Sequence, residues 1–227
     1  MISAKLVAYT QPTIEVGASD PEQFISYCAR VSNPSNQENW DTAEGLLKYC
    51  IRNQHWSIFE MVNAVVEVKA PRDITRQMLR HRSFSFQEFS QRYSDEIQFC
   101  DREVRMQDKT NRQNSISIDD FYDGPNQYVR DCWDEDVKEI VELVKEHYKD
   151  QRKLNVAKEV ARVLLPEGLT MSTMYANGTL RSWMHYLEVR EGNGTQKEHI
   201  QLANKIREVL LPVFPVVLSL TNANTTT

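Results

Sequence analysis

The stretch RHRSFSFQEFSQRY, residues 80–93, concentrates residue types that bind anions and nucleotide bases. Arg80, His81 and Arg82 stand in a row, and Arg76 lies one helical turn before Arg80. The planar fork of an arginine side chain binds two oxygens of one phosphate. The serines and glutamines of the stretch can hydrogen-bond a heteroaromatic ring, and its phenylalanines can line the ring faces. The stretch therefore predicts a nucleotide site better than a site for a bare ion.

Two other interpretations fit the same residues. A solvated turn at a helix C-terminus also gathers cations, because they complement the helix dipole; the chain would then be a helical interaction protein. Alternatively, the basic residues and phenylalanines would bind and stack RNA without catalysis, and salt would weaken that binding strongly. The formal net charge of −5 argues against a general nucleic-acid binder.

Composition indicates a soluble globular protein. The chain has 227 residues, of which 41% are hydrophobic and 26% charged, enough apolar material for one large domain. The N-terminus lacks the apolar core of a signal peptide, and no apolar run approaches the roughly 20 residues that cross a bilayer. We therefore expect a cytoplasmic protein, or one in the host cytoplasm if the source is a virus, with no membrane partner.

Cysteine and histidine spacing favours neither a disulfide framework nor a metal site. The four cysteines are widely separated without a C-x-x-C pair, which is typical of free thiols in a reducing compartment. The five histidines include no H-x-x-x-H or H-E-x-x-H pair. No metal is therefore predicted.

The elements that must position the basic stretch begin with two helices. Asp20-Pro21 with Gln23 predicts a helix to about Val31 through an N-cap, an early proline and a capping box. Asp41 and Glu44 have the same spacing and predict a second helix through Cys50. Residues 61–70 alternate with period two, so we expect a half-buried strand that Pro71 ends. Asp73 is expected to cap a short helix that runs out at the basic stretch.

The second half reads mainly as helix. The longest amphipathic pattern spans 126–149, and further helices are expected over 155–165, 179–189 and 197–211. Residues 170–175 fit either helix or strand, and 191–194 form a glycine-containing turn. We expect an α+β fold, a single domain over 1–220 with a small, mostly antiparallel sheet packed by several helices, and a frayed tail at 221–227.

The spacing of the basic stretch resembles a family signature. Arg80-His81-Arg82, seven further residues, Ser90 and then Arg92-Tyr93 is similar to the motif of flavin-dependent thymidylate synthases. Three other pieces resemble the family in the same order: 29–32 (ARVS), 55–60 (HWSIFE), and two arginines, Arg162 in VARVLLP and Arg190 in YLEVREGNGTQKEH. The resemblance covers roughly residues 25–210.

The resemblance implies an activity and a set of partners. Enzymes of this family make dTMP from dUMP, with methylenetetrahydrofolate as carbon donor and NADPH as reductant through bound FAD. They use no cysteine nucleophile, and they are homotetramers whose active sites are shared between subunits. They bind the flavin without a Rossmann fingerprint, which agrees with the absence of G-x-G-x-x-G here.

The resemblance also assigns residues. Arg190 would be catalytic, stabilising negative charge on the ionised pyrimidine. The dUMP ligands would be Gln77, Met78, Leu79, Arg80, Glu88, Phe89, Ser90, Gln91, Arg92, Arg162 and Arg190. The FAD ligands would be Ser57, Arg80, His81, Arg82, Glu88, Thr179, Leu180, Arg181 and His185, with Ser32 and Glu60. His55 would help to place the folate or the nicotinamide.

Taken singly, several of these residues have ordinary structural interpretations. Arg190 has Glu188 and Glu191 nearby for a surface salt bridge, and Ser90 suits a turn in which its hydroxyl bonds its own backbone. Arg162 fits a solvated helix position, and His185 fits a packed core histidine.

Two positions depart clearly from the family pattern, and Gln87 is a tolerable amide swap where an asparagine is frequent. Many members carry a histidine four residues after the catalytic arginine, where this chain has Gly194, so flavin affinity or the handling of NADPH is expected to differ. The asparagine usually found two residues before Arg181 is Thr179 here, with Asn177 close by.

Overall fold

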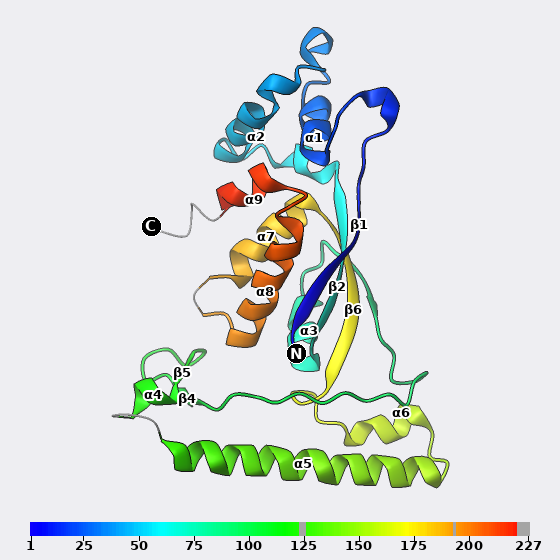
Figure 1. Ribbon diagram of the computed structural model, residues 1–227, viewed down its shortest axis with the longest axis vertical. Helices are drawn as coiled ribbons and strands as arrows, with labels where there is room; N and C mark the ends of the chain where they lie inside the picture. The colour runs from blue at the N-terminus through cyan, green and yellow to red at the C-terminus, as the bar shows by residue number, and fades with distance from the viewer. Residues whose placement is uncertain (123–125, 193, 222–227) are drawn as a thin grey trace. The chain divides into compact units, whose positions relative to one another are not determined.

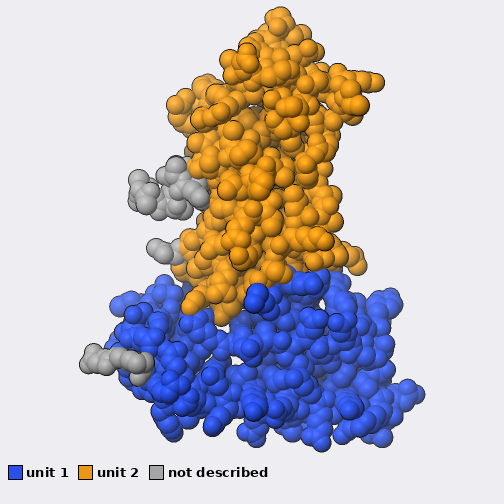
Figure 2. Space-filling model, in the orientation of Figure 1, with its two compact units in different colours: residues 1, 69–77, 88–173 blue, residues 2–68, 78–87, 174–227 orange. Residues whose placement is uncertain are grey.

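The computed structural model describes residues 1–122, 126–192 and 194–221. The described residues form two compact units, each with its own internal packing (Figure 2). Unit 1 contains Met1, 69–77 and 88–173, and unit 2 contains 2–68, 78–87 and the chain from 174 onward. Within the described ranges, every helix is too short or too polar to cross a lipid bilayer.

The fold is α+β, which confirms the class expected from the sequence. Four strands form one sheet in the order β1-β2-β6-β3 (Figure 1). Their bounds are Ser3–Tyr9 for β1, Asn63–Pro71 for β2, Ser85–Glu88 for β3 and Met171–Thr179 for β6. A separate antiparallel hairpin pairs β4, Arg105–Gln107, with β5, Ser115–Ser117, and places Met106 opposite Ile116.

Strand β2 follows the alternation that predicted it. Ala64, Val66 and Val68 are buried along one face, and Pro71 is the last residue of the strand. Strand β6 settles the ambiguous segment at 170–175, because Ser172, Met174, Ala176 and Gly178 alternate inward in the same way. That segment is therefore strand.

Unit 2 is built mainly from helices. They are α1 (Pro21–Ala29), α2 (Ala43–Arg52), α7 (Leu180–Arg190), α8 (Lys197–Leu210) and α9 (Pro215–Thr221), with short 3₁₀ turns at Ile14–Val16, Pro34–Asn36, Trp40–Thr42 and Trp56–Glu60. Helices α7 and α8 pack against each other, α8 packs on β1, and α2 contacts both α1 and α9 (Figure 1). Trp183, Tyr186, Phe59 and Phe214 are among the largest fully buried side chains of the chain.

Capping chemistry placed α1 correctly and α2 only roughly. The Asp20 side chain accepts a hydrogen bond from Gln23 N at 2.8 Å, and the Gln23 side chain accepts one from Ser19 N. In α2 the expected cap at Asp41 is wrong. Asp41 lies inside the 3₁₀ turn, and the helix begins only at Ala43.

Helix α9 was not predicted, and its anchor comes from a distant residue. The buried carboxylate of Glu22, on α1, accepts hydrogen bonds from Val216 N at 3.1 Å and Val217 N at 2.8 Å. These amides belong to the first turn of α9, where backbone N–H groups lack partners within the helix. Thr221 ends α9, and the rest of the expected frayed tail lies outside the described residues.

Unit 1 carries the longest helix, α5 (Gln127–Lys153), whose N-cap Asn126 accepts from Val129 N at 3.2 Å. The other helical segments are α3 (Arg72–Met78, whose last residue belongs to unit 2), α4 (Ile118–Phe121), α6 (Lys158–Ala161) and a 3₁₀ turn at Arg162–Leu164. The helix expected over 155–165 is much shorter. Asn155 has a φ of +63° and Ala157 has a non-helical backbone conformation, so α6 begins only at Lys158, and after Ala161 the chain tightens into the 3₁₀ turn. Asp73 lies in the first turn of α3 instead of capping it.

Candidate active site

Helix α7 carries some of the predicted flavin residues of unit 2 together with the predicted catalytic residue Arg190. Thr179 caps it, since its Oγ1 accepts a hydrogen bond from Ser182 N at 3.2 Å. Threonine and asparagine are both good N-caps, so the departure at this position keeps the helix start intact. Arg181 and His185 follow at a spacing of four residues, which places them on one helix face.

A pocket of about 1050 Å³ opens beside this face, entirely within unit 2. Four of the predicted flavin ligands line it: Glu60, Thr179, Arg181 and His185. The Arg181 guanidinium donates a hydrogen bond to the Glu60 carboxylate across the pocket wall. The remaining lining residues are Lys48, Ile51, Arg52, Gln54, Trp56, Ser83, Ser182, Met184, Glu188, Leu220 and Thr221.

The donor set of this pocket fits a flavin. Its volume is at the upper end of small-molecule sites, and its walls mix apolar side chains with a few fixed polar groups. Trp56, Ile51 and Met184 offer apolar surface for a planar ring system, whereas Arg181 and Lys48 offer positive charge for phosphate oxygens.

His81 and Arg190 form the most informative contact in unit 2. Arg190 Nε donates a hydrogen bond to His81 Nε2 at 2.9 Å. Burial, followed by the charges of Arg190, His185 and Arg80, lowers the pKa of His81 to about 4. His81 is therefore neutral at pH 7 and accepts through Nε2.

Arg190 does not form the surface salt bridge that its acidic neighbours allowed. Glu191 instead pairs with Arg207, whose Nε and Nη2 lie 2.6 Å from the two carboxylate oxygens. Among the described residues, no side chain or carbonyl accepts a hydrogen bond from Arg190 Nη1 or Nη2. Burial lowers the pKa of this guanidinium, although arginine stays charged at neutral pH. Two donors thus remain available on a partly buried cation.

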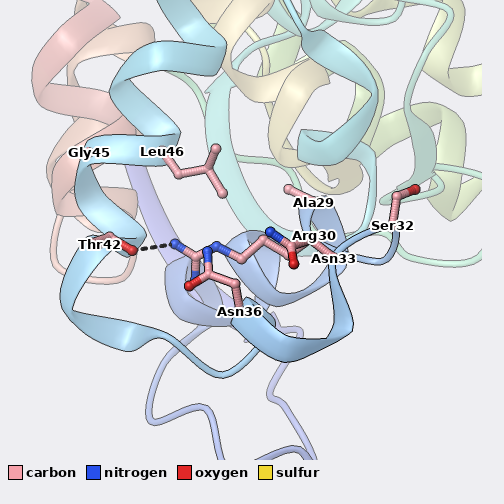
Figure 3. A pocket seen from close by; sticks show the side chains of 8 residues that line it. All are labelled: Ala29, Arg30, Ser32, Asn33, Asn36, Thr42, Gly45 and Leu46. Atoms are coloured by element: carbon pink, nitrogen blue, oxygen red, sulfur yellow. Dashed lines mark hydrogen bonds between the residues drawn. The ribbon is translucent and has the colours of Figure 1, made fainter.

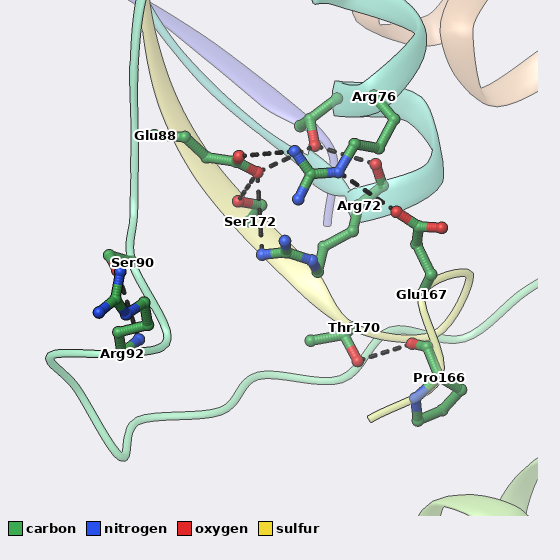
Figure 4. Close-up of polar contacts among 10 residues, drawn as sticks. Arg72, Arg76, Glu88, Ser90, Arg92, Pro166, Glu167, Thr170 and Ser172 are labelled. Atoms are coloured by element: carbon green, nitrogen blue, oxygen red, sulfur yellow. Dashed lines mark hydrogen bonds and ion pairs between the residues drawn. The ribbon is translucent and has the colours of Figure 1, made fainter. Parts of the chain in front are cut away.

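In unit 1, Glu88 is the centre of a polar cluster (Figure 4). Arg76 Nη1 lies 3.1 Å from Oε2, and Arg72 Nη1 lies 3.8 Å from Oε1. Ser172 Oγ donates to Oε1 at 2.8 Å, and Arg76 also pairs with Glu167 at 3.3 Å. Two cations and a hydroxyl therefore hold this carboxylate in one orientation.

The Glu88 cluster contains residues that the sequence analysis missed. Arg72 follows the strand-ending Pro71 and lies four residues before Arg76, so the two share one face of α3. That spacing was a usable signal. Ser172 had none, because it comes from β6, 84 residues away along the chain from Glu88.

The loop after β3 is shaped by Ser90. Its hydroxyl accepts a hydrogen bond from Arg92 N at 3.3 Å, and its carbonyl accepts one from Tyr93 N at 3.1 Å. The structural interpretation of Ser90 as a turn hydroxyl is therefore correct in this structure. Arg92 pairs with Glu159 at 3.2 Å, and Gln91 is buried.

The other predicted site residues lie in different environments. Met78 and Leu180 bury their side chains in the core. His55 packs edge-on against Tyr49, with ring centroids 5.8 Å apart. Arg162 opens the 3₁₀ turn after α6 and contributes to the positive charge around Arg72. Phe89 N donates to Thr173 O at 2.8 Å.

Ser32 lies at a different pocket of about 480 Å³ in unit 2 (Figure 3). The buried Arg30 crosses this pocket and donates hydrogen bonds to Thr42 Oγ1 at 2.8 Å and to Asn39 O. Arg30, from the ARVS element, therefore ties the end of α1 to the start of α2.

The predicted dUMP ligands divide between the two units. Gln77, the run 88–92 and Arg162 belong to unit 1, whereas Met78, Leu79, Arg80 and Arg190 belong to unit 2.

The α+β fold and the polar pocket of unit 2 are compatible with the class of enzymes that bind a nucleotide and a flavin. Comparison with known proteins gives the family. The model of the Thy1 family, "Thymidylate synthase complementing protein", matches residues 5–216. The chain therefore belongs to this family, and it is a flavin-dependent thymidylate synthase that methylates dUMP in dTMP biosynthesis.

Individual relatives are similar over nearly their whole length. A "Probable flavin-dependent thymidylate synthase" of Paramecium bursaria Chlorella virus 1 is 45% identical, over 95% of this chain and 97% of its own. A flavin-dependent thymidylate synthase of Synechocystis is 41% identical over the same shares. Among solved structures, a UMP/dUMP methylase, PolB of Streptomyces cacaoi, shares the fold with a TM-score of 0.79 at 24% identity, covering 100% of this chain and 97% of that one.

Proposed function

We propose that the enzyme binds FAD in the unit 2 pocket and methylates dUMP reductively, with methylenetetrahydrofolate as carbon donor and NADPH as reductant. The observation that carries this proposal is the Arg190–His81 pair, which leaves the two terminal guanidinium nitrogens unused on a partly buried cation at the end of the helix that lines the pocket. When bound, the flavin supplies the hydride chemistry. The steps below concern what the residues of the chain do.

Arg190 is proposed to activate the pyrimidine. A uracil ring that loses its N3 proton carries negative charge over N3 and the two carbonyl oxygens. A guanidinium that cannot deprotonate stabilises that charge, and in a site shielded from water the effect is large. Because His81 occupies Nε, the ring would meet Nη1 and Nη2 as a fork.

Cysteine chemistry supports activation without a covalent nucleophile. Burial raises the pKa of the thiols of Cys28, Cys50 and Cys100, so these groups are protonated at neutral pH. The thiolate is the nucleophilic form of cysteine. Three of the four thiols are thus poorly suited to attack the pyrimidine.

The arginines of the basic motif are proposed to hold the nucleotide. Arg80, Arg92 and Arg162 would bind the dUMP phosphate, and the backbone and side chains of Gln77 and the run 88–92 would contact the sugar and base. The Glu88 carboxylate is already oriented before the nucleotide binds, because Arg72, Arg76 and Ser172 hold it. We propose that the enzyme is a homotetramer in which residues of neighbouring subunits complete each active site.

The test combines an absorption spectrum with a product assay. The gently purified protein, supplemented with FAD and desalted, is expected to keep an oxidised-flavin spectrum that shifts on addition of dUMP. With methylenetetrahydrofolate and NADPH it should then form dTMP. A protein that retains no flavin and forms no dTMP would contradict the proposal. The Arg190→Ala variant should keep the flavin spectrum but lose dTMP formation by about 10²–10³-fold.

A further inference from the structure

A series of side-chain contacts connects His199 on α8 to Arg190 on α7. His199 Nε2, on α8, lies 3.0 Å from the Tyr186 hydroxyl on α7. The Tyr186 ring packs against His81, with centroids 5.0 Å apart and planes at 67°. His81 Nε2 then accepts from Arg190 Nε at 2.9 Å. His199 and Tyr186 are both fully buried.

The donor and acceptor roles along this line are constrained. Arg190 Nε–H can only donate, so His81 must carry its single proton on Nδ1. Burial lowers the pKa of His199 to about 3 and raises the pKa of Tyr186 well above its usual range. Both histidines are therefore neutral and the tyrosine stays protonated across the physiological range.

The groups facing His81 all disfavour its charged form. Arg190, His185 and Arg80 contribute positive charge, and the Tyr186, Phe84 and His185 rings surround it at centroid distances of 5.0 to 6.4 Å. The groups facing His199 include Tyr186, Arg190 and His81. If the Tyr186 ring moved, water would reach His81 and its protonated form would become accessible. Protonated His81 cannot accept from Arg190 Nε.

We propose that His199 and Tyr186 are positioning residues for Arg190. His199 holds the Tyr186 hydroxyl, the Tyr186 ring keeps water from His81, and His81 in turn fixes Arg190 Nε so that the two terminal nitrogens stay free for the pyrimidine. This proposal rests on the proposed function for what Arg190 binds. The coupling from His199 to His81 is a property of the protein alone and is tested separately.

The first test measures the tautomer and the titration of each histidine ring by NMR. The protein contains five histidines, and long-range ¹H–¹⁵N spectra of the histidine-labelled protein, assigned with His81→Asn and His199→Leu, report the tautomer and titration of each ring. We expect His81 as the Nδ1–H tautomer at pH 7. In His199→Leu its titration should move up by about one pH unit or more towards 6.5.

Conservative and control variants make this test specific. His199→Gln should restore the wild-type titration of His81, since an amide can still hydrogen-bond the Tyr186 hydroxyl. His147→Leu, at an exposed position of α5, is the matched control and should leave His81 unchanged. An unaltered His81 titration in His199→Leu would overturn the proposal. If that variant does not fold, Tyr186→Phe, which keeps the ring and loses the hydroxyl, gives the same test.

The second test measures how the pH dependence of kcat/KM for dUMP changes in the variant. In His199→Leu, kcat/KM for dUMP should fall at least about 2-fold near pH 5, where a large fraction of His81 is then protonated, and recover towards wild type above pH 8, where His81 is neutral again. The proposal would be overturned if the loss of kcat/KM matched only the fraction of protein that is folded. In that case the acid side of the pH profile of kcat/KM would be the same as in the wild type. Wild-type protein that makes no dTMP would instead contradict the proposed function, and the histidine spectra would still decide the coupling.

Discussion

At the residue scale, the role proposed for Arg190 depends on the shape of its guanidinium as much as on its charge. It donates from Nε to His81 and keeps two terminal donors. Arg190→Lys retains the cation but loses both the Nε contact and the fork. We expect kcat/KM for dUMP to fall about 10²–10³-fold while the flavin spectrum persists.

Steady-state kinetics on flavin-loaded protein checks the Arg190→Lys prediction. The control is Arg112→Lys, an exposed position of unit 1 whose turnover should stay unchanged. Near-wild-type turnover of Arg190→Lys would show that charge alone suffices and that His81 has no role in orienting this side chain.

The buried histidines predict acid-sensitive stability. The folded-state pKa values of His81 and His199, about 4 and about 3, lie below the ordinary value of 6.5. Between these values and 6.5 the unfolded chain binds more protons than the folded protein, so the free energy of unfolding falls as pH falls through this window. Each such site contributes at most about 1.4 kcal/mol per pH unit, and less for His81, which is partly solvated.

Urea unfolding at pH 7 and pH 5 measures this dependence. The midpoint should be lower at pH 5, and His199→Gln should flatten the change because it removes one of the two groups. His147→Gln, at an exposed position, should keep the wild-type slope. A midpoint that does not move between pH 7 and pH 5 would contradict the prediction.

At the scale of elements, α9 is anchored by one carboxylate. Glu22 accepts from Val216 N and Val217 N, and it is buried. Glu22→Ala leaves both amides without that acceptor, and we expect a loss of about 1–3 kcal/mol in the free energy of unfolding. Glu22→Gln keeps one acceptor oxygen and should lose less. Glu15→Ala, an exposed position, is the control, and equal stability of all three variants would contradict the proposed anchor.

Strand β6 passes the Phe84 ring at Gly178. A Cβ at this position would overlap the ring edge of Phe84, which itself packs on Trp183 with centroids 4.6 Å apart. Gly178→Ala should therefore displace Phe84 and destabilise the protein by about 1–3 kcal/mol.

The matched control is Gly45→Ala, in α2, where an added Cβ meets nothing within 4 Å. Alanine is the better helix former, so this variant should be neutral or more stable by up to about 1 kcal/mol. Thermal unfolding of the pair separates the overlap at Gly178 from the general effect of adding a methyl group.

At the scale of the whole molecule, bound ligands should stabilise the folded protein. A ligand at 100 times its Kd adds about 2.7 kcal/mol, which for a chain of this size raises Tm by about 5–10 °C. We expect FAD to raise Tm, and dUMP to raise it further once FAD is bound. The alternative of an RNA-binding protein predicts instead that a single-stranded oligonucleotide raises Tm in a strongly salt-dependent manner, with no effect of FAD.

The sequence alone determined the local features of this protein. The alternation of 61–70, the Asp20 cap and the amphipathic pattern from residue 126 each depend on neighbours within a few turns, and each gave the expected element. The motif around 80–93 and its three companion elements indicated the family, because they keep type and spacing along the chain. The first residues of α6 and α2 were less predictable from the sequence. The positive φ of Asn155 precedes α6, and the 3₁₀ turn at Trp40–Thr42 precedes α2.

Only the tertiary structure decided which of these residues act on one another. Glu88 meets Ser172 across 84 positions, Glu22 meets Val217 across 195, and Arg190 meets His81 across 109. No period or spacing encodes such pairs, because each depends on contact between distant elements, such as β3 with β6 for Glu88 and Ser172 and α1 with α9 for Glu22 and Val217. The protonation of His81 and His199 follows from the same packing, since burial, which no single segment specifies, sets the energy of their charged forms.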